Sequence, residues 1–300
     1  MYILIITSSY DQTSTYIINK YFNETNFFRL NIDKISNYII NIDGEGWTII
    51  DDNNNILHNN EVKSIYYRKP VYPNLEKYDT IYHSLIKKDI LTLIKGLIET
   101  FPGTVLTKPS ILELCENKVN QLLYASHYDI KIPKSYIGNS LLKYNEFCEF
   151  KSIIKPLSTA KITNGNFTEV FNTNYLRKCD VDISLTPVYL QEYIEKLFEV
   201  RIICINDKIY SIKIQCKNDL DWRLDYINHK YDIIECPDYI KKFCYDMLIH
   251  YSLKFGAFDF IVNKHGSWIF LELNPNGQWL WLELSLQLDI SDKIYKLLNT

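Results

Sequence analysis

Two apolar segments near the C-terminus, residues 256–262 and 268–274, carry acidic or amide side chains within otherwise apolar runs. Side chains alternate between the two faces of a β-strand, so Asp259 would lie on the face opposite its apolar neighbours. If the loop between the segments holds an even number of residues, centred on residues 265–266, Asp259 pairs with Glu272 in a hairpin. Their Cβ atoms would then lie about 4.5–5.5 Å apart.

This hairpin predicts a metal site. Simple alternation places Glu272 and Asn274 on one face, together with Trp268 and Phe270. Carboxylate and amide oxygens are hard ligands that suit Mg²⁺. Without a cation, Asp259 and Glu272 would repel each other by about 4 kcal/mol at an effective dielectric constant of 20. The alternative is a pair of solvated acids on an open sheet face, and the apolar character of both segments argues against it.

Two lysines interrupt apolar patterns. Lys118 lies in the apolar stripe of a helix that we expect over residues 110–125, and Lys155 ends the apolar strand 152–155. Because a buried, unpaired ammonium group is costly, each lysine is expected to meet an anion. The alternative for both is that they reach water or pair with a nearby glutamate. The following loop, 157–166, is rich in hydrogen-bond donors and could close over phosphates, but it matches no Walker pattern.

A third candidate segment runs from residue 188 to residue 194 and leads into a second apolar strand that contains Glu199 and Arg201. A strand that leaves a small domain and enters a larger one can offer backbone amide and carbonyl groups to the edge of an adenine. A carboxylate several residues further on can hold ribose hydroxyls.

The first 107 residues predict a small α/β domain. A buried strand at residues 2–6 is followed by a helix near residues 13–22 and by further short apolar strands. Alternation of strands and helices favours a mostly parallel sheet. The loop after the first strand, residues 7–11, contains no GxGxxG, so the dinucleotide-binding fingerprint is absent.

Composition excludes several function classes. The formal net charge of −3 gives no general attraction to nucleic acid or to a membrane, and no apolar run approaches the roughly 20 residues of a membrane span. The N-terminus lacks the features of a signal peptide, so we expect a cytoplasmic protein. Seven cysteines form no CxxC pair and six histidines form no HExxH motif, which disfavours a disulfide framework or a zinc site.

Together, the two lysines, the segment Gln191–Ile194 (the hinge) and the acidic hairpin resemble the ATP-grasp fold over roughly residues 110–285. Within that superfamily, the run from Glu272 to Glu283, ELNPNGQWLWLE, is similar to the C-terminal signature of graspetide synthetases. These are peptide macrocyclases of the microviridin, plesiocin and thuringinin type. The sequences YYRKP at residues 66–70 and DWR at residues 221–223 also resemble motifs of that group.

The resemblance implies an α/β protein with three domains. Residues 1–107 would form the N-terminal pre-ATP-grasp domain with its parallel sheet, and residues 108–187 a small central lid domain. Residues 188–300 would form a C-terminal domain with an antiparallel sheet. ATP would bind between the last two.

The resemblance also implies a role for each matching residue. Phosphate contacts are expected from Lys118, Lys155 and Lys213, adenine contacts from Gln191, Glu192, Tyr193 and Ile194, ribose contacts from Glu199, and magnesium ligands from Asp259, Glu272 and Asn274. Arg201 and Arg223 would hold the γ-phosphate or an acyl phosphate. For the peptide substrate we expect contacts from Arg68, Asp219 and Asp221, although a solvated acidic loop is an equal alternative for the two aspartates. The run Trp279–Trp281 would either pack in the core or face the substrate.

The implied activity is ATP-dependent peptide ligation. The enzyme would phosphorylate an Asp or Glu side chain of a ribosomally made precursor that has a leader and a core. A Thr or Ser hydroxyl would then form an ω-ester, or a Lys amine an ω-amide. One alternative is a carboxylate–amine ligase that acts on a small molecule or a protein tail, and another is a non-catalytic ATP- or peptide-binding module. A homodimer is expected from the resemblance alone.

Overall fold

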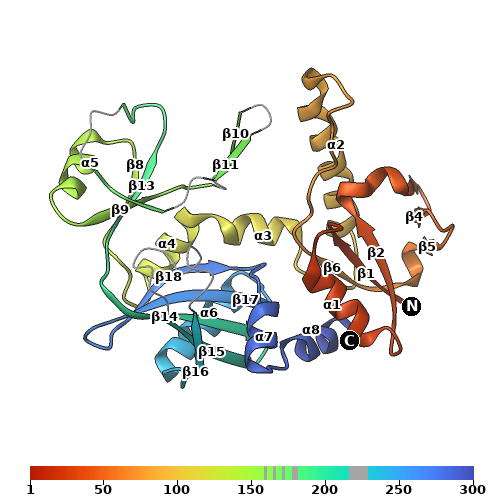
Figure 1. The fold of residues 1–300 in the computed structure, drawn as a ribbon. Coiled ribbons are helices and arrows are strands. Elements are labelled where there is room, and N and C mark those ends of the chain that lie inside the picture. Colours follow the sequence, from red (N-terminus) through yellow and green to blue (C-terminus); the bar gives the residue numbers. More distant parts are fainter. Residues whose placement is uncertain (159–160, 165–166, 171–172, 178–181, 216–228) are drawn as a thin grey trace. The chain divides into compact units, whose positions relative to one another are not determined.

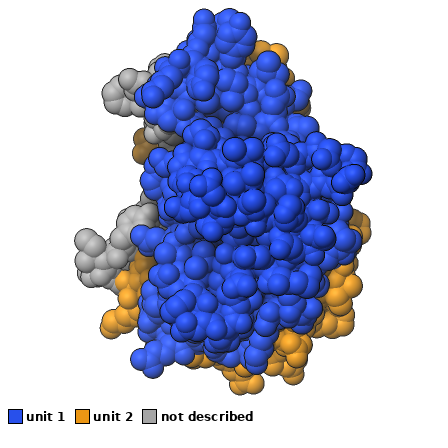
Figure 2. All heavy atoms as spheres, turned by 90° about the vertical axis from the view of Figure 1, so that its right-hand side faces the viewer, with its two compact units in different colours: residues 1–113, 252–255, 276–300 blue, residues 114–251, 256–275 orange. Residues whose placement is uncertain are grey.

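The computed structural model describes residues 1–300 except 159–160, 165–166, 171–172, 178–181 and 216–228 (Figure 1). By its internal contacts the chain divides into two compact units, coloured separately in Figure 2. Unit 1 comprises Met1–Glu113, Ser252–Phe255 and Asn276–Thr300, and unit 2 comprises Leu114–Tyr251 and Gly256–Pro275. Among the helices of the described residues, none is both long enough and apolar enough to cross a membrane.

Unit 1 contains the predicted parallel sheet. Its strands lie in the order β2 (Asn26–Asn31), β1 (Tyr2–Thr7), β6 (Val62–Tyr67) and β7 (Thr104–Leu106), and all three pairings are parallel. Parallel neighbours need long crossover connections, and two of these carry the helices α1 (Gln12–Tyr21) and α2 (Thr80–Glu99). A separate antiparallel sheet consists of β3 (Ile39–Asp43), β4 (Gly46–Ile50) and β5 (Ile56–His58).

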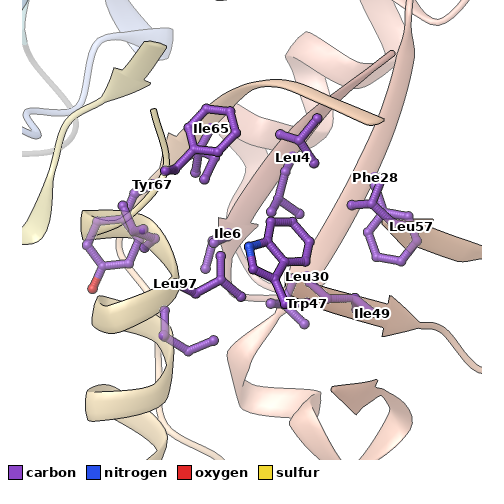
Figure 3. Close-up of a cluster of buried hydrophobic side chains, with 14 of the residues drawn as sticks. Leu4, Ile6, Phe28, Leu30, Trp47, Ile49, Leu57, Ile65, Tyr67 and Leu97 are labelled. Carbon is purple, nitrogen blue, oxygen red and sulfur yellow. The ribbon is translucent and has the colours of Figure 1, made fainter. Parts of the chain in front are cut away.

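The central strand β1 is apolar on both faces because the sheet is covered on both sides. Residues 3–6 of this strand are fully buried. Leu4 and Ile6 pack in one cluster with Leu97 of α2 and with Trp47 and Ile49 of β4 (Figure 3). Burying one such aliphatic side chain stabilises the fold by about 1.5–3 kcal/mol, so this cluster anchors unit 1.

The C-terminal helices α7 (Leu280–Leu286) and α8 (Ile290–Leu298) belong to unit 1. The Ser64 hydroxyl of β6 donates a hydrogen bond to the Leu298 carbonyl at 2.6 Å, and the Tyr16 hydroxyl donates to Glu283 at 3.0 Å. The last 25 residues, 276–300, therefore belong to the unit of the N-terminal sheet, whereas the expected division assigns them to the third domain. The division of the remaining chain into a lid and a C-terminal domain stays a prediction.

Unit 2 contains two larger sheets. The first has the order β12 (Asn174–Tyr175), β9 (Ser152–Lys155), β13 (Val188–Glu192) and β8 (Ser135–Gly138), with every pairing antiparallel. The second has the order β16 (Lys230–Ile233), β15 (Lys208–Gln215), β14 (Lys196–Ile205), β17 (Phe255–Asn263) and β18 (Trp268–Asn274). The hairpin of β10 (Lys161–Asn164) and β11 (Phe167–Val170) lies in the predicted lid. Helices α4 (Lys118–Ser126), α5 (Leu141–Cys148) and α6 (Asp238–His250) complete the unit.

The helix predicted over residues 110–125 is two helices in the structure. Helix α3 spans Pro109–Glu116 and α4 begins at Lys118. Between them Asn117 has an extended backbone, and its side chain accepts hydrogen bonds from the backbone N–H groups of Val119 and Asn120. Asparagine is a strong N-cap residue because its side-chain oxygen satisfies the free N–H groups at a helix start. This cap starts a new helix at Lys118, which the apolar periodicity did not reveal.

Candidate active site

The hairpin of β17 and β18 pairs Asp259 with Glu272, as predicted. The pairing depends on a β-bulge, however, and not on a loop with an even number of residues. The loop between the strands holds five residues, 263–267, because Val262 pairs with Trp268. The odd loop would have paired Asp259 with Leu271. A β-bulge between the Phe260–Phe270 pair and the Asp259–Glu272 pair shifts the register by one residue and brings the two acids opposite each other.

The bulge corrects the predicted placement of the aromatic residues. Phe270 is opposite Phe260 and therefore shares its face, and the two ring centroids are 5.5 Å apart. Phe270 also packs at 5.0 Å against Phe243 of α6, and Trp268 packs at 6.0 Å against Phe260. Simple alternation wrongly placed Trp268 and Phe270 with Glu272. In the structure they lie in the core beneath the sheet, and the acids lie on the other face.

The acid pair is held by donors from two sides. Arg201 of β14 places Nη1 at 2.7 Å and 2.8 Å from the two carboxylate oxygens of Asp259, and both side chains are buried. Asn274 donates from Nδ2 to Asp259 at 3.1 Å and to Glu272 at 3.2 Å. These hydrogen bonds offset the repulsion between two neighbouring carboxylates.

This donor set fits a magnesium ion. The described residues contain no group of three or more His, Cys, Asp or Glu side chains arranged for a metal. Mg²⁺ is commonly held by one or two carboxylates and by phosphate oxygens, so Asp259 and Glu272 are sufficient acids. The amide of Asn274 lies between them. A rotation of this amide by half a turn would present its oxygen at the same place, and the two orientations are distinguished only by their hydrogen bonds.

A pocket with an empty volume of about 410 Å³ opens beside these residues in unit 2. It brings four of the predicted site residues together: Lys118, Lys155, Gln191 and Glu272. Its remaining lining is largely apolar or aromatic and comes from Gln121, Leu122, Ala125, Ile132, Pro133, Tyr189, Phe270 and Leu271. A mostly apolar pocket with a few convergent polar groups is typical of a small-molecule site.

Both lysines face this pocket, and both have partners within the chain. Lys118, the first residue of α4, donates from Nζ to the Pro156 carbonyl at 2.5 Å. Lys155 of β9 pairs in register with Tyr189, and its Nζ lies 5.9 Å from the centroid of that ring. Helix α4 and strand β9 thus each contribute one positive charge to the same pocket.

Of the predicted hinge Gln191–Ile194, Gln191 lines the pocket. The Gln191 side chain is buried and donates from Nε2 to the Ser135 and Tyr189 hydroxyls at 3.1 Å and 3.2 Å. The backbone N–H groups of Glu192 and Tyr193 donate to the carbonyls of residues 134 and 151, each at 2.9 Å. Burial raises the pKa of the Tyr189 hydroxyl, and the nearby Glu272 carboxylate raises it further. The hydroxyl therefore stays protonated at neutral pH.

Glu199 and Arg201 point to the same face of β14, because they are two residues apart. Glu199 is buried and forms an ion pair of 2.6 Å with Lys196, which sequence reasoning missed. Lys213 was expected to contact phosphate, but it pairs in register with Val200 and so lies on the opposite face. Its Nζ is 4.8 Å from the centroid of the Phe198 ring on that face. The structure does not bring Lys213 to Glu199 and Arg201.

Arg68, which is expected to contact the peptide substrate, is buried within unit 1. Its side chain is fully buried, with Nε 3.3 Å from an oxygen of Asp11. Nη1 donates to Asn276 at 3.4 Å, and Nη2 donates to Gln278 at 2.5 Å and to Thr13 at 3.3 Å. Because a buried guanidinium is costly unless it is paired, this network is a structural anchor. It holds the signature segment that follows Asn274.

Some predicted residues cannot be placed. Arg223, Asp219 and Asp221 lie outside the described residues. Of the aromatic run, Trp279 is fully buried, which agrees with core packing at that position. The structure adds one further polar side chain at the pocket, Gln121 of α4. Its spacing of three residues from Lys118 on a helix was a signal that could have identified it.

Comparisons with known proteins now define the class. No protein-family model matches the sequence, and no curated protein matches it. The structure superposes on macrocyclase MdnC of Microcystis aeruginosa MRC, solved with precursor peptide MdnA, with a TM-score of 0.89 and 25% identity over 100% of both chains. It also matches a Chryseobacterium gregarium RiPP-associated ATP-grasp ligase, solved with ADP and a leader and core peptide. That match has a TM-score of 0.83 and 24% identity over 99% of this chain and 96% of that chain.

A more distant match is D-alanyl-alanine synthetase A of Vibrio cholerae, with a TM-score of 0.59 and 12% identity over 100% of this chain and 97% of the other. The protein has the fold of the ATP-grasp ligases. Within that fold, the resemblance to ATP-grasp peptide macrocyclases that the motifs indicated is confirmed at the level of structure.

Proposed function

We propose that this protein is an ATP-dependent peptide ligase that forms side-chain macrocycles in a ribosomally made precursor peptide. The observation that carries the proposal is the pocket in unit 2 where Lys118, Lys155 and Gln191 meet Glu272 of the acidic hairpin. Support comes from the similar structures of MdnC, which is bound to a precursor peptide, and of the Chryseobacterium ligase, which is bound to ADP and peptide.

The nucleotide would bind in this pocket with its phosphates toward the two lysines. The hinge Gln191–Ile194 would contact adenine, and Glu199 would contact the ribose. Asp259, Glu272 and Asn274 would hold Mg²⁺, which when bound neutralises phosphate charge. Arg201, whose guanidinium donates to Asp259, would bind a phosphoryl oxygen, and Arg223 is proposed for the same task.

The proposed reaction has two steps. A carboxylate of the peptide attacks the γ-phosphorus of ATP, ADP leaves, and an acyl phosphate forms. A hydroxyl or amine of the same peptide then attacks the acyl carbon and releases phosphate, which leaves an ω-ester or an ω-amide. Both partners of the first step are anionic, so the main task of the site is to supply positive charge and to position the reactants. No covalent nucleophile of the protein is required.

Mass spectrometry tests the proposal. The full-length protein is incubated with ATP, Mg²⁺ and short candidate precursors whose cores repeat Thr with Glu or Asp. The expected product has lost one water per ring, and ADP accumulates in step. Mild alkali opens esters and leaves amides intact, so it assigns the linkage. ATP turnover that requires a small amino acid or a protein tail and leaves every peptide unchanged would favour the carboxylate–amine ligase. A cytoplasmic location, a homodimer and a leader-docking role for Asp219 and Asp221 stay predictions.

A further inference from the structure

Gln121 of α4 binds the backbone of the strand that carries two of the proposed magnesium ligands. Its side chain is 5% exposed and lines the pocket. Nε2 donates to the carbonyls of Leu273 and Cys115, each at 2.7 Å. Oε1 accepts from the backbone N–H of Leu273 at 2.8 Å. One amide thus satisfies both polar backbone groups of the residue between Glu272 and Asn274.

This contact lies at the free edge of β18. Among the described residues β18 is the last strand of its sheet, so one side of its backbone has no strand partner there. Lys131 covers part of that edge, since its carbonyl accepts from the Phe270 N–H at 2.9 Å. Gln121 covers the edge at Leu273, beyond the bulge. The edge is therefore held on both sides of the bulge that brings Glu272 opposite Asp259.

The same helix carries Lys118. Residues three apart on a helix are neighbours on its surface, and both Lys118 and Gln121 line the pocket. A movement of α4 would therefore move a proposed phosphate contact and the support of two metal ligands together.

We propose that Gln121 is a positioning residue that holds Glu272 and Asn274 in their ligating arrangement through the backbone of Leu273. The inference rests on the proposed function, because it takes these two residues as magnesium ligands. Substitution of a residue that orients metal ligands without touching the metal typically lowers metal affinity by about 10–100-fold. The predicted effect is therefore on the contribution of Mg²⁺ to nucleotide binding, with a smaller effect on binding of the nucleotide itself.

Calorimetric titration of the full-length protein with ADP, with and without Mg²⁺, tests this inference. In the wild type, Mg²⁺ is expected to tighten ADP binding. Gln121→Met keeps the length of the side chain and removes its hydrogen bonds, and it should reduce this gain by about tenfold or more while the Mg²⁺-free Kd changes little. The matched control is Asn120→Ala on the same helix, because Asn120 is only half-buried and its amide bonds only to Leu114 among the described side-chain contacts. It should retain the full gain.

Two results would overturn the positioning role. One is an unchanged Mg²⁺ gain in Gln121→Met, and the other is an equal loss of affinity with and without Mg²⁺, which marks a residue that only supports the fold. If Gln121→Met does not fold, Gln121→Glu replaces it. That variant retains an acceptor for the Leu273 N–H and loses both donated bonds, so an unchanged gain there would also reject the inference. A wild type whose ADP binding ignores Mg²⁺ would instead reject the proposed function.

Discussion

Asp259→Asn removes the negative charge that faces the Arg201 guanidinium. In the wild type the two side chains are 5% and 6% exposed, and Nη1 reaches both carboxylate oxygens within 2.8 Å. Removing one partner of a buried ion pair costs about 3–5 kcal/mol, because the other charge stays buried without compensation. Asparagine can keep one hydrogen bond, so we expect a loss near the lower end, about 3 kcal/mol in the free energy of unfolding.

Glu272→Gln is the matched comparison. Glu272 is partly exposed and accepts from the Asn274 amide, a bond that glutamine can retain. We expect its unfolding free energy to stay within about 1 kcal/mol of the wild type. Both variants should lose ATP turnover, because each removes one carboxylate charge from the proposed metal site.

Urea unfolding followed by circular dichroism measures the first quantity, and release of ADP measures the second. A third variant, Arg201→Met with Asp259→Leu, replaces the pair with apolar groups. It should recover most of the lost stability, since such replacements are often neutral, and it should remain inactive. Equal stability of Asp259→Asn and the wild type would refute the assignment of Arg201 and Asp259 as a buried pair. Normal turnover in Glu272→Gln would refute the metal site.

Three further predictions concern the other site residues. Arg68→Met should lower the free energy of unfolding by about 3–5 kcal/mol in urea titrations, because it removes the cation that faces the buried Asp11 carboxylate, and unchanged stability would argue against a buried ion pair. Lys155→Met should weaken ADP binding by about 10–100-fold in calorimetry, whereas Lys213→Met should bind ADP like the wild type; equal losses would mean that the sheet faces are misassigned. Burial raises the pKa of the Cys236 thiol to about 12. Since the thiolate is the reactive form, Cys236 should resist iodoacetamide at neutral pH and react on denaturation, as read by peptide mass mapping.

Local patterns were sufficient for the main elements of this fold. The apolar run at residues 2–6 predicted β1, because a strand buried on both faces must be apolar throughout. Alternation around Asp259 predicted an acid on the face opposite Phe258 and Phe260, and the structure has it there. Each of these features depends on residues close in the sequence.

Contacts between residues distant in the sequence decide the surroundings of two other predicted site residues. Arg68 is a residue type that often contacts anionic ligands. In the fold, however, it is enclosed by Asp11 and Gln278, which lie far from it in the sequence. Lys213 is an isolated cation on an apolar strand, and only its pairing with Val200 shows which face it takes.

The residue types alone therefore predicted the chemistry of the site: two carboxylates and an amide in a hairpin, and two lysines in apolar surroundings. Their convergence was decided by tertiary contacts. The bulge near Leu271 sets which residue faces Asp259, and the Gln121 amide binds the strand beyond that bulge. The reason is physical: periodicity reports the face of an element, but a shift of one residue in register reverses that face, and only the contacts of the folded chain select the register.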